Sequence, residues 1–150
     1  MEVAVGGVLA WVGEVQSSGA AQAQHRFEGR VYRGETGVEP PGSAPIQGVT
    51  VSLYCSNNQG QQGEFLRSTV TDSAGWYGLG VSATDVCEYF NIVESNPAGY
   101  WSVGATTVDG NCISANWIEY QIPLEGKTLT GNKFWDQTNR VYLPLVVRGD

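Results

Sequence analysis

The residues that most often carry chemistry are few in this sequence. It has three cysteines and a single histidine, His25. No two cysteines have the Cys-x-x-Cys spacing of a metal site, so the sequence predicts no structural zinc site. It has no Gly-x-Ser-x-Gly elbow and no phosphate-binding loop, and nothing in the spacing of its fifteen acidic residues places two carboxylates together. We therefore predict a protein that is not an enzyme and that holds no cofactor or metal.

The cysteines can form one disulfide bond. In an exported domain two of the three are expected to pair, and we favour Cys87 with Cys112, because the strand and loop between them can return the chain to itself. Cys55 with Cys87 is the alternative. A third interpretation makes all three cysteines small buried hydrophobic residues. The unpaired cysteine is expected to be a buried free thiol rather than a bridge to another chain.

Composition indicates short strands and turns rather than helices. The chain has 150 residues, which is enough for one domain with a hydrophobic core. Charged residues make up only 15%, and there are 20 glycines. The net charge of −7, with eight scattered basic residues, argues against nucleic-acid binding, which needs clustered Lys and Arg.

The stretch from Thr69 to Trp101 organises the predicted fold. A strand ends at Thr71, the turn Asp72–Gly75 follows, and a second strand begins at Trp76. Asp and Gly are typical turn residues, so this pattern predicts a β-hairpin. Residues 87–94 alternate apolar and polar side chains as a half-buried strand does.

Other segments read as strands or loops. Phe27, Gly29 and Val31 fall on one face of a predicted first strand, 27–33. Further strands are predicted over 49–54, 102–108, 117–122 and 132–136, and loops over 34–44, 56–63 and 126–131.

Three sequence patterns resemble the Cna-B and serine-aspartate-repeat B-type domains of bacterial surface proteins, in the prealbumin-like group. The patterns are Thr-Asp-x-x-Gly-x-Tyr, Glu-x-Asn-Pro-x-Gly-Tyr and Pro-Ile-x-Gly-Val-x-Val-x-Leu. The matching residues are Thr71, Asp72, Gly75, Tyr77, Glu94, Asn96, Pro97, Gly99 and Tyr100, with Pro45 to Leu53 as the third pattern. The resemblance, which covers roughly residues 27–136, implies an all-β, antiparallel sandwich of seven to nine strands with Greek-key-like connections, and we predict that this domain spans residues 25–150.

The same resemblance raises two further possibilities. Some Cna-B domains carry an internal isopeptide bond between a lysine on the first strand and an Asn or Asp on the last, beside a buried carboxyl group. The first strand here has arginines but no lysine, and the lysines, Lys127 and Lys133, come late, so we expect no such bond. Calcium sites of related domains need oxygen-rich loops, and the loop with Glu35 and Glu39 lacks that spacing.

Residues 1–24 are predicted to form an arm outside the sandwich. Its apolar residues recur at near-alternate positions, as in a strand, and they are Val3, Val5, Val8, Ala10 and Val12. The apolar run is shorter than the ~20 residues of a membrane span. The arm can pack on its own domain or pair as a donor strand with a sheet edge of a neighbouring copy, and the sequence does not separate these alternatives.

The C-terminal residues read as a strongly apolar strand. Its alternating members are Val141, Leu143, Leu145 and Val147, and Pro144 confines it to an edge or a bulge. An apolar edge strand needs a cover, which the arm can supply within one chain or between chains.

Two functions of different classes follow. The first is an extracellular structural protein, a subunit of a surface fibre, pilus-like filament or stalk that self-associates through strand pairing. The alternative is an adhesin-type module that binds carbohydrate or protein through loops at one end of the sandwich. Exposed aromatic side chains on those loops would favour the second.

Overall fold

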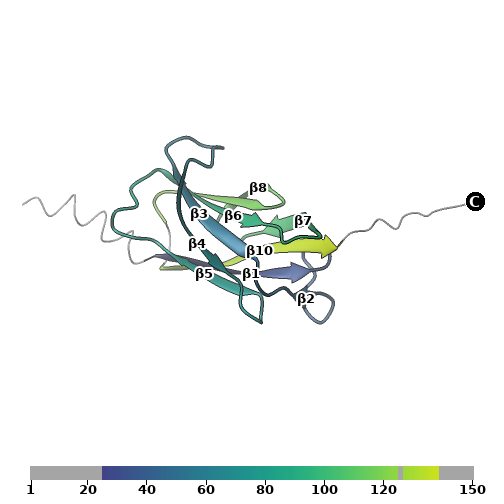
Figure 1. The fold of residues 1–150 in the computed structure, drawn as a ribbon. Coiled ribbons are helices and arrows are strands. Elements are labelled where there is room, and N and C mark those ends of the chain that lie inside the picture. Colours follow the sequence, from purple (N-terminus) through teal and green to yellow (C-terminus); the bar gives the residue numbers. More distant parts are fainter. Residues whose placement is uncertain (1–24, 125–126, 139–150) are drawn as a thin grey trace, which may run out of the picture.

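The computed structural model describes residues 25–124 and 127–138, which form ten strands and no helix (Figure 1). The strands are β1 (Arg26–Arg33), β2 (Ala44–Pro45), β3 (Thr50–Ser56), β4 (Glu64–Val70), β5 (Trp76–Gly80), β6 (Tyr89–Ser95), β7 (Tyr100–Thr106), β8 (Asn111–Ser114), β9 (Trp117–Gln121) and β10 (Thr128–Thr138). The predicted arm and the C-terminal strand lie outside the described residues. No helix in the described part is long and apolar enough to cross a membrane.

The strands form two sheets of five, which confirms the all-β sandwich. The first sheet has the order β2-β1-β10-β7, with β5 also paired to β1, and the second has the order β4-β3-β6-β9-β8. All neighbouring pairs are antiparallel except β1 and β10, which run parallel. This departs from the purely antiparallel sandwich that was expected. The first and last strands therefore lie side by side at the centre of one sheet.

The core lies between the sheets and follows the period-2 alternation of the strands. Phe27 and Val31 point inward from β1 as predicted, and both are fully buried. Opposite them, β6 contributes Phe90 and Ile92, and the rings of Phe27 and Phe90 are 5.8 Å apart. Burying each large apolar side chain contributes about 1.5–3 kcal/mol, so the alternating positions select this pairing of sheet faces.

The predicted hairpin at Asp72–Gly75 is wrong. The turn does form, because the Asp72 carboxylate accepts hydrogen bonds from the backbone N–H groups of Ala74 (2.9 Å) and Trp76 (3.0 Å). However, β4 pairs with β3, and β5 pairs with β1 of the other sheet. The carbonyl of Gly75 accepts from the Val31 N–H at 2.8 Å, so the turn attaches to β1 and carries the chain across the sandwich.

Two irregular loops lie against the outer faces of the sheets. The loop between β1 and β2 lies over β10, where the Trp135 indole N–H donates to the Val38 carbonyl at 2.8 Å. Trp135 is consequently only 1% exposed, although it faces away from the core. The loop between β3 and β4 is held in a similar way, because the Gly60 N–H donates to the buried Glu119 carboxylate at 2.6 Å.

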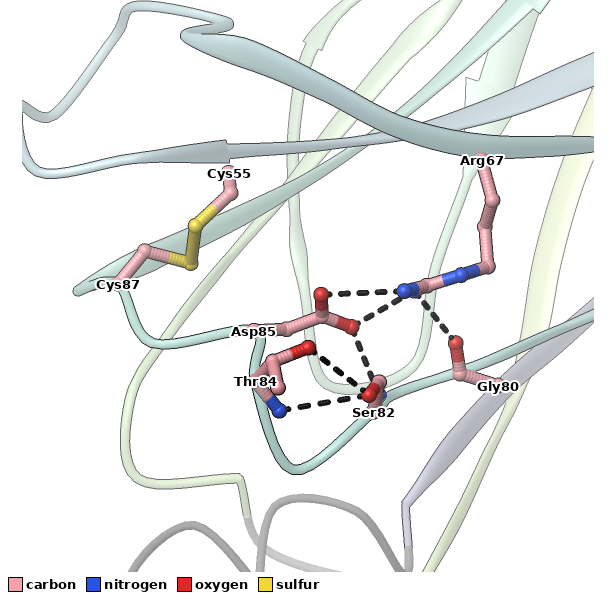
Figure 2. Close-up of polar contacts among 7 residues, drawn as sticks. All are labelled: Cys55, Arg67, Gly80, Ser82, Thr84, Asp85 and Cys87. Atoms are coloured by element: carbon pink, nitrogen blue, oxygen red, sulfur yellow. Dashed lines mark hydrogen bonds and ion pairs between the residues drawn. A yellow bond between two sulfur atoms is a disulfide. The ribbon is translucent and has the colours of Figure 1, made fainter.

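The disulfide bond joins Cys55 and Cys87, so the favoured pairing of Cys87 with Cys112 is wrong (Figure 2). The β3–β6 register places Cys55 opposite Phe90, and Cys87 lies three residues before Phe90. Cys112 lies on β8, two strands beyond β6, where it is free and exposed rather than buried. Which residues pair therefore depends on the order of strands in the sheet rather than on spacing along the chain.

The loop that carries Cys87 is fixed by a second set of contacts (Figure 2). The guanidinium group of Arg67 forms an ion pair with the Asp85 carboxylate at 2.7 Å and also donates to the Gly80 carbonyl at 2.9 Å. Asp85 in turn accepts from the Ser82 N–H at 2.7 Å. Because Asp85 is buried, this pairing holds the β5–β6 loop against β4 and keeps Cys87 near Cys55.

The disulfide assignment predicts how the thiols react. The unreduced, folded protein is expected to take up one maleimide group per chain, at Cys112, and the reduced and unfolded protein three. Mass spectrometry of the intact protein measures both numbers. Labelling of Cys55 or Cys87 in the unreduced protein, located by peptide mapping, would contradict the assignment.

Candidate functional site

Two carboxyl groups meet inside the sandwich, and we call Glu94 and Asp136 the acid pair. Glu94 lies near the end of β6 in the second sheet, and Asp136 lies near the end of β10 in the first. Both are buried, with exposures of 1% and 0%, and each carboxyl group affects the pKa of the other. The acid pair therefore links the two sheets at one end of the core.

Polar side chains complete the surroundings of the acid pair. With its nitrogen turned toward the acids, the Asn96 amide donates to Asp136 Oδ1 at 3.1 Å and to Glu94 Oε2 at 3.2 Å. The Ser102 hydroxyl donates to Glu94 Oε1 at a longer 3.5 Å. Asp136 Oδ2 has no hydrogen-bond partner among the described residues.

Burial sets the protonation of the acid pair. Removal from water and, after it, the neighbouring Asp136 together raise the pKa of Glu94 from 4.5 to about 10. Burial also raises the pKa of Asp136, although the hydrogen bond with Glu94 opposes that rise. Two adjacent buried carboxylates cannot both be ionised cheaply, so the acid pair holds at least one proton at neutral pH.

The acid pair corrects the statement that nothing places two carboxylates together. Sequence alternation does put Glu94 on the same face of β6 as the buried Phe90 and Ile92, and Asp136 on the same face of β10 as Phe134. An acid in line with core residues is the signal that was available. What the sequence did not supply was the packing of β6 against β10, which brings both acids to the same end of the core.

The acid pair has two of the three parts that the Cna-B resemblance implies for an isopeptide bond. Asp136 lies on the last strand, and Glu94 is a buried carboxyl group beside it. The inward positions of the first strand, however, hold Phe27, Gly29 and Val31, none of which has an amine. The chemistry open to the acid pair is therefore the sharing of a proton between two carboxyl groups.

The remaining candidate groups are separate from the acid pair. The Lys133 ammonium group forms an ion pair with Glu39 at 2.6 Å, which lowers the pKa of that carboxyl group. Glu39 is thus held by Lys133 on the outer side of the sheet. The part of the chain that the structure describes contains no group of three or more His, Cys, Asp or Glu side chains that could hold a metal ion.

A second buried polar centre is formed by Asn132, which sequence reasoning did not single out. Its amide nitrogen donates to the carbonyls of Glu28 on β1 (3.0 Å) and Leu129 (2.7 Å). Its amide oxygen accepts from the hydroxyls of Tyr120 (2.7 Å) and Thr107 (2.9 Å). Asn132 is fully buried, and every polar atom of its side chain is paired, so it fixes β10 to β1 and to the second sheet.

The fold is similar to that of solved pilins. The shaft pilin SpaA from Lactobacillus rhamnosus GG superposes with a TM-score of 0.50 at 15% identity, over 76% of this chain and 52% of that one. A single-site variant of it gives 0.52 at 14% identity, over 77% and 51%. The full-length major pilin SpaD from Corynebacterium diphtheriae gives 0.50 at 12% identity, over 76% and 32%.

The chain thus spans about half the length of SpaA and a third of SpaD. No protein-family model and no curated protein matches the sequence. At these identities the likeness concerns the fold. The resemblance drawn from the sequence motifs is therefore confirmed at the level of the fold.

Proposed function

We propose that this protein is a non-enzymatic subunit of an extracellular surface fibre, a pilus-like filament or stalk. The observation that carries the proposal is its likeness in fold to shaft pilins. The Cys55–Cys87 disulfide supports an extracellular location, because such bonds persist in oxidising compartments. The acid pair and Asn132 contribute to this role as internal links between the two sheets.

Assembly is proposed to use strand pairing. Among the described strands, β2, β4, β5, β7 and β8 each have one neighbour and so leave an edge with free backbone groups. Phe65 and Val70 on β4 are 57% and 58% exposed, which makes this edge apolar. The arm, residues 1–24, and the segment 140–148, which the sequence predicts to be a strand, carry apolar residues at near-alternate positions and are the proposed donors to such edges in neighbouring copies.

The adhesin alternative has less support. Binding through loops at one end of the sandwich would be favoured by exposed aromatic side chains there. In residues 25–124 and 127–138, every Phe, Tyr and Trp lies within a strand and none in a connecting loop. The exposed aromatic residues are Phe65 on β4 and Trp101 on β7, both on edge strands, where an assembly contact is the better interpretation.

The test is the native mass by light scattering, for the full chain and for a chain that starts at His25. The full chain is expected to form large or open-ended species and the shortened chain to be monomeric, because the donor strand is missing. Circular dichroism of both chains controls for folding. Monomers of equal stability in both cases would refute assembly through the arm and move the adhesin alternative to the front.

A further inference from the structure

The first and last strands are arranged as a load-bearing pair. β1 and β10 run parallel, in a register that extends from Arg26 opposite Thr128 to Arg33 opposite Asp136. The described chain therefore begins β1 at one end of the sandwich and leaves β10 at the other (Figure 1). We propose that this parallel pair, which we call the β1–β10 clamp, bears the tension when the fibre is pulled. The inference rests on the proposed function, in which residues 1–24 and 139–150 connect neighbouring copies.

The direction of the load determines how the β1–β10 clamp resists it. Pulling the start of β1 and the end of β10 apart slides two parallel strands past each other, so their hydrogen bonds are loaded together. An edge strand that is pulled from one end separates from its neighbour one bond at a time. Forced unfolding is governed by the unfolding rate. Because breaking many bonds together is slower than breaking them one at a time, the first geometry requires much more force than the second.

Backbone hydrogen bonds close the β1–β10 clamp at both ends. The Arg26 N–H donates to the Lys127 carbonyl at 2.8 Å where β1 begins, and the Gly34 N–H donates to the Asp136 carbonyl at 3.0 Å just after it ends. Between them the register shifts at a bulge, where the Asn132 side chain donates to the Glu28 carbonyl at 3.0 Å. Sliding of β10 past β1 must therefore break this side-chain bond as well.

Neighbouring strands protect the β1–β10 clamp from water. β7 pairs with the far side of β10, and β5 and β2 pair with the far side of β1. Asn132 also accepts from the Tyr120 hydroxyl of β9 at 2.7 Å, which ties the pair to the second sheet. Buried hydrogen bonds that water cannot replace are costly to break, so this placement adds to the resistance.

The pulling direction provides the first test, by single-molecule force spectroscopy on the full chain. One handle stays at the N-terminus, and the second is attached either to the C-terminus of the Cys112→Ser variant or to the native Cys112 thiol on edge strand β8. The end-to-end geometry is expected to require a severalfold higher unfolding force. Equal forces in the two geometries would overturn the proposal.

The disulfide supplies an internal length standard for the same traces. Cys55 and Cys87 are 32 residues apart, so the loop between them stays closed until it is reduced. Reduction is expected to lengthen the end-to-end unfolding step by about 110 Å, from the span of an extended chain. This difference between the reduced and the unreduced protein shows that the force was applied to the intact fold. Traces whose unfolding step does not have the expected length are discarded.

Matched substitutions provide the second test. Asn132→Ala removes the side-chain bond from β10 to β1, and Ile92→Ala removes a fully buried apolar side chain from β6 in the other sheet. Chemical denaturation measures the stability lost by each variant. For each variant, the drop in end-to-end unfolding force is divided by the stability that the variant has lost. This ratio is expected to be severalfold larger for Asn132→Ala than for Ile92→Ala. Forces that simply follow stability would refute the β1–β10 clamp.

These results separate the inference from the proposed function. A chain that stays monomeric in light scattering but shows the directional difference in force would keep the β1–β10 clamp and remove the fibre role. A chain that assembles through its arm but unfolds at equal force in both geometries would keep the fibre role and remove the β1–β10 clamp.

Discussion

Raising the pH from 5 to 8 is expected to lower the free energy of unfolding of this protein by about 2 kcal/mol through Glu94. The folded state raises the pKa of Glu94 from 4.5 to about 10, so over this range folded Glu94 keeps its proton and unfolded Glu94 releases it. The stabilisation is complete below pH 4.5 and is lost as the pH rises toward 10. One proton gives at most ~1.4 kcal/mol per pH unit. We expect about half of that, because the Asn96 amide can also stabilise an ionised pair.

Glu94→Gln is the control for this prediction. The amide has the shape of the protonated acid and can donate to Asp136, but it does not titrate. The variant is expected to match the parent at pH 5 and to exceed its stability at pH 8. Urea unfolding at both pH values gives the difference in free energy of unfolding between the two proteins. The contributions of other titrating groups, such as Glu39, whose pKa is lowered, are the same in both proteins and cancel in this difference. Parallel pH profiles for parent and variant would show that Glu94 is already ionised in the fold.

The local sequence pattern predicted where single strands lie better than it predicted which strands pair with each other. The alternation of residues 27–33 placed Phe27 and Val31 together on one face, and that of residues 87–94 predicted a half-buried strand, because burial of one face of a strand is a local property. The Asp72–Gly75 turn was also identified, yet turn chemistry is the same whether the two strands pair with each other or cross between sheets. The hydrogen bond from Val31 to Gly75, which decides between these cases, joins residues 44 positions apart.

The candidate site was visible only in part for the same reason. Glu94 occupies a core position of its strand and Asp136 occupies one of another, and both facts can be read from the sequence. Their contact depends on two sheets packing face to face, which no local pattern specifies. The favoured disulfide failed in the same way, because Cys112 is nearer to Cys87 in sequence than Cys55 is, but it lies on an edge strand of the same sheet.

Gly29→Ala is expected to destabilise the protein by about 3 kcal/mol, at the upper end of overpacking effects. A Cβ atom at Gly29 would overlap the carbonyl oxygen of Asn132 and lie 2.7 Å from the Tyr77 hydroxyl. The Tyr77 hydroxyl donates to that same carbonyl at 2.8 Å, so β10 must move and a buried hydrogen bond must weaken. Because Gly29 does not have a positive φ, the cost is steric and comes from the close approach of the two strands.

Gly80→Ala is the matched control, because Gly80 also lies in a strand of the first sheet without a positive φ, and no atom lies within 4 Å of its added Cβ. It is expected to change stability by less than about 1 kcal/mol, and toward stabilisation, since alanine restricts the unfolded chain. Urea midpoints of both variants measure the contrast. If the two substitutions had equal effects, β1 and β10 would not be in the close contact that joins the first strand to the last.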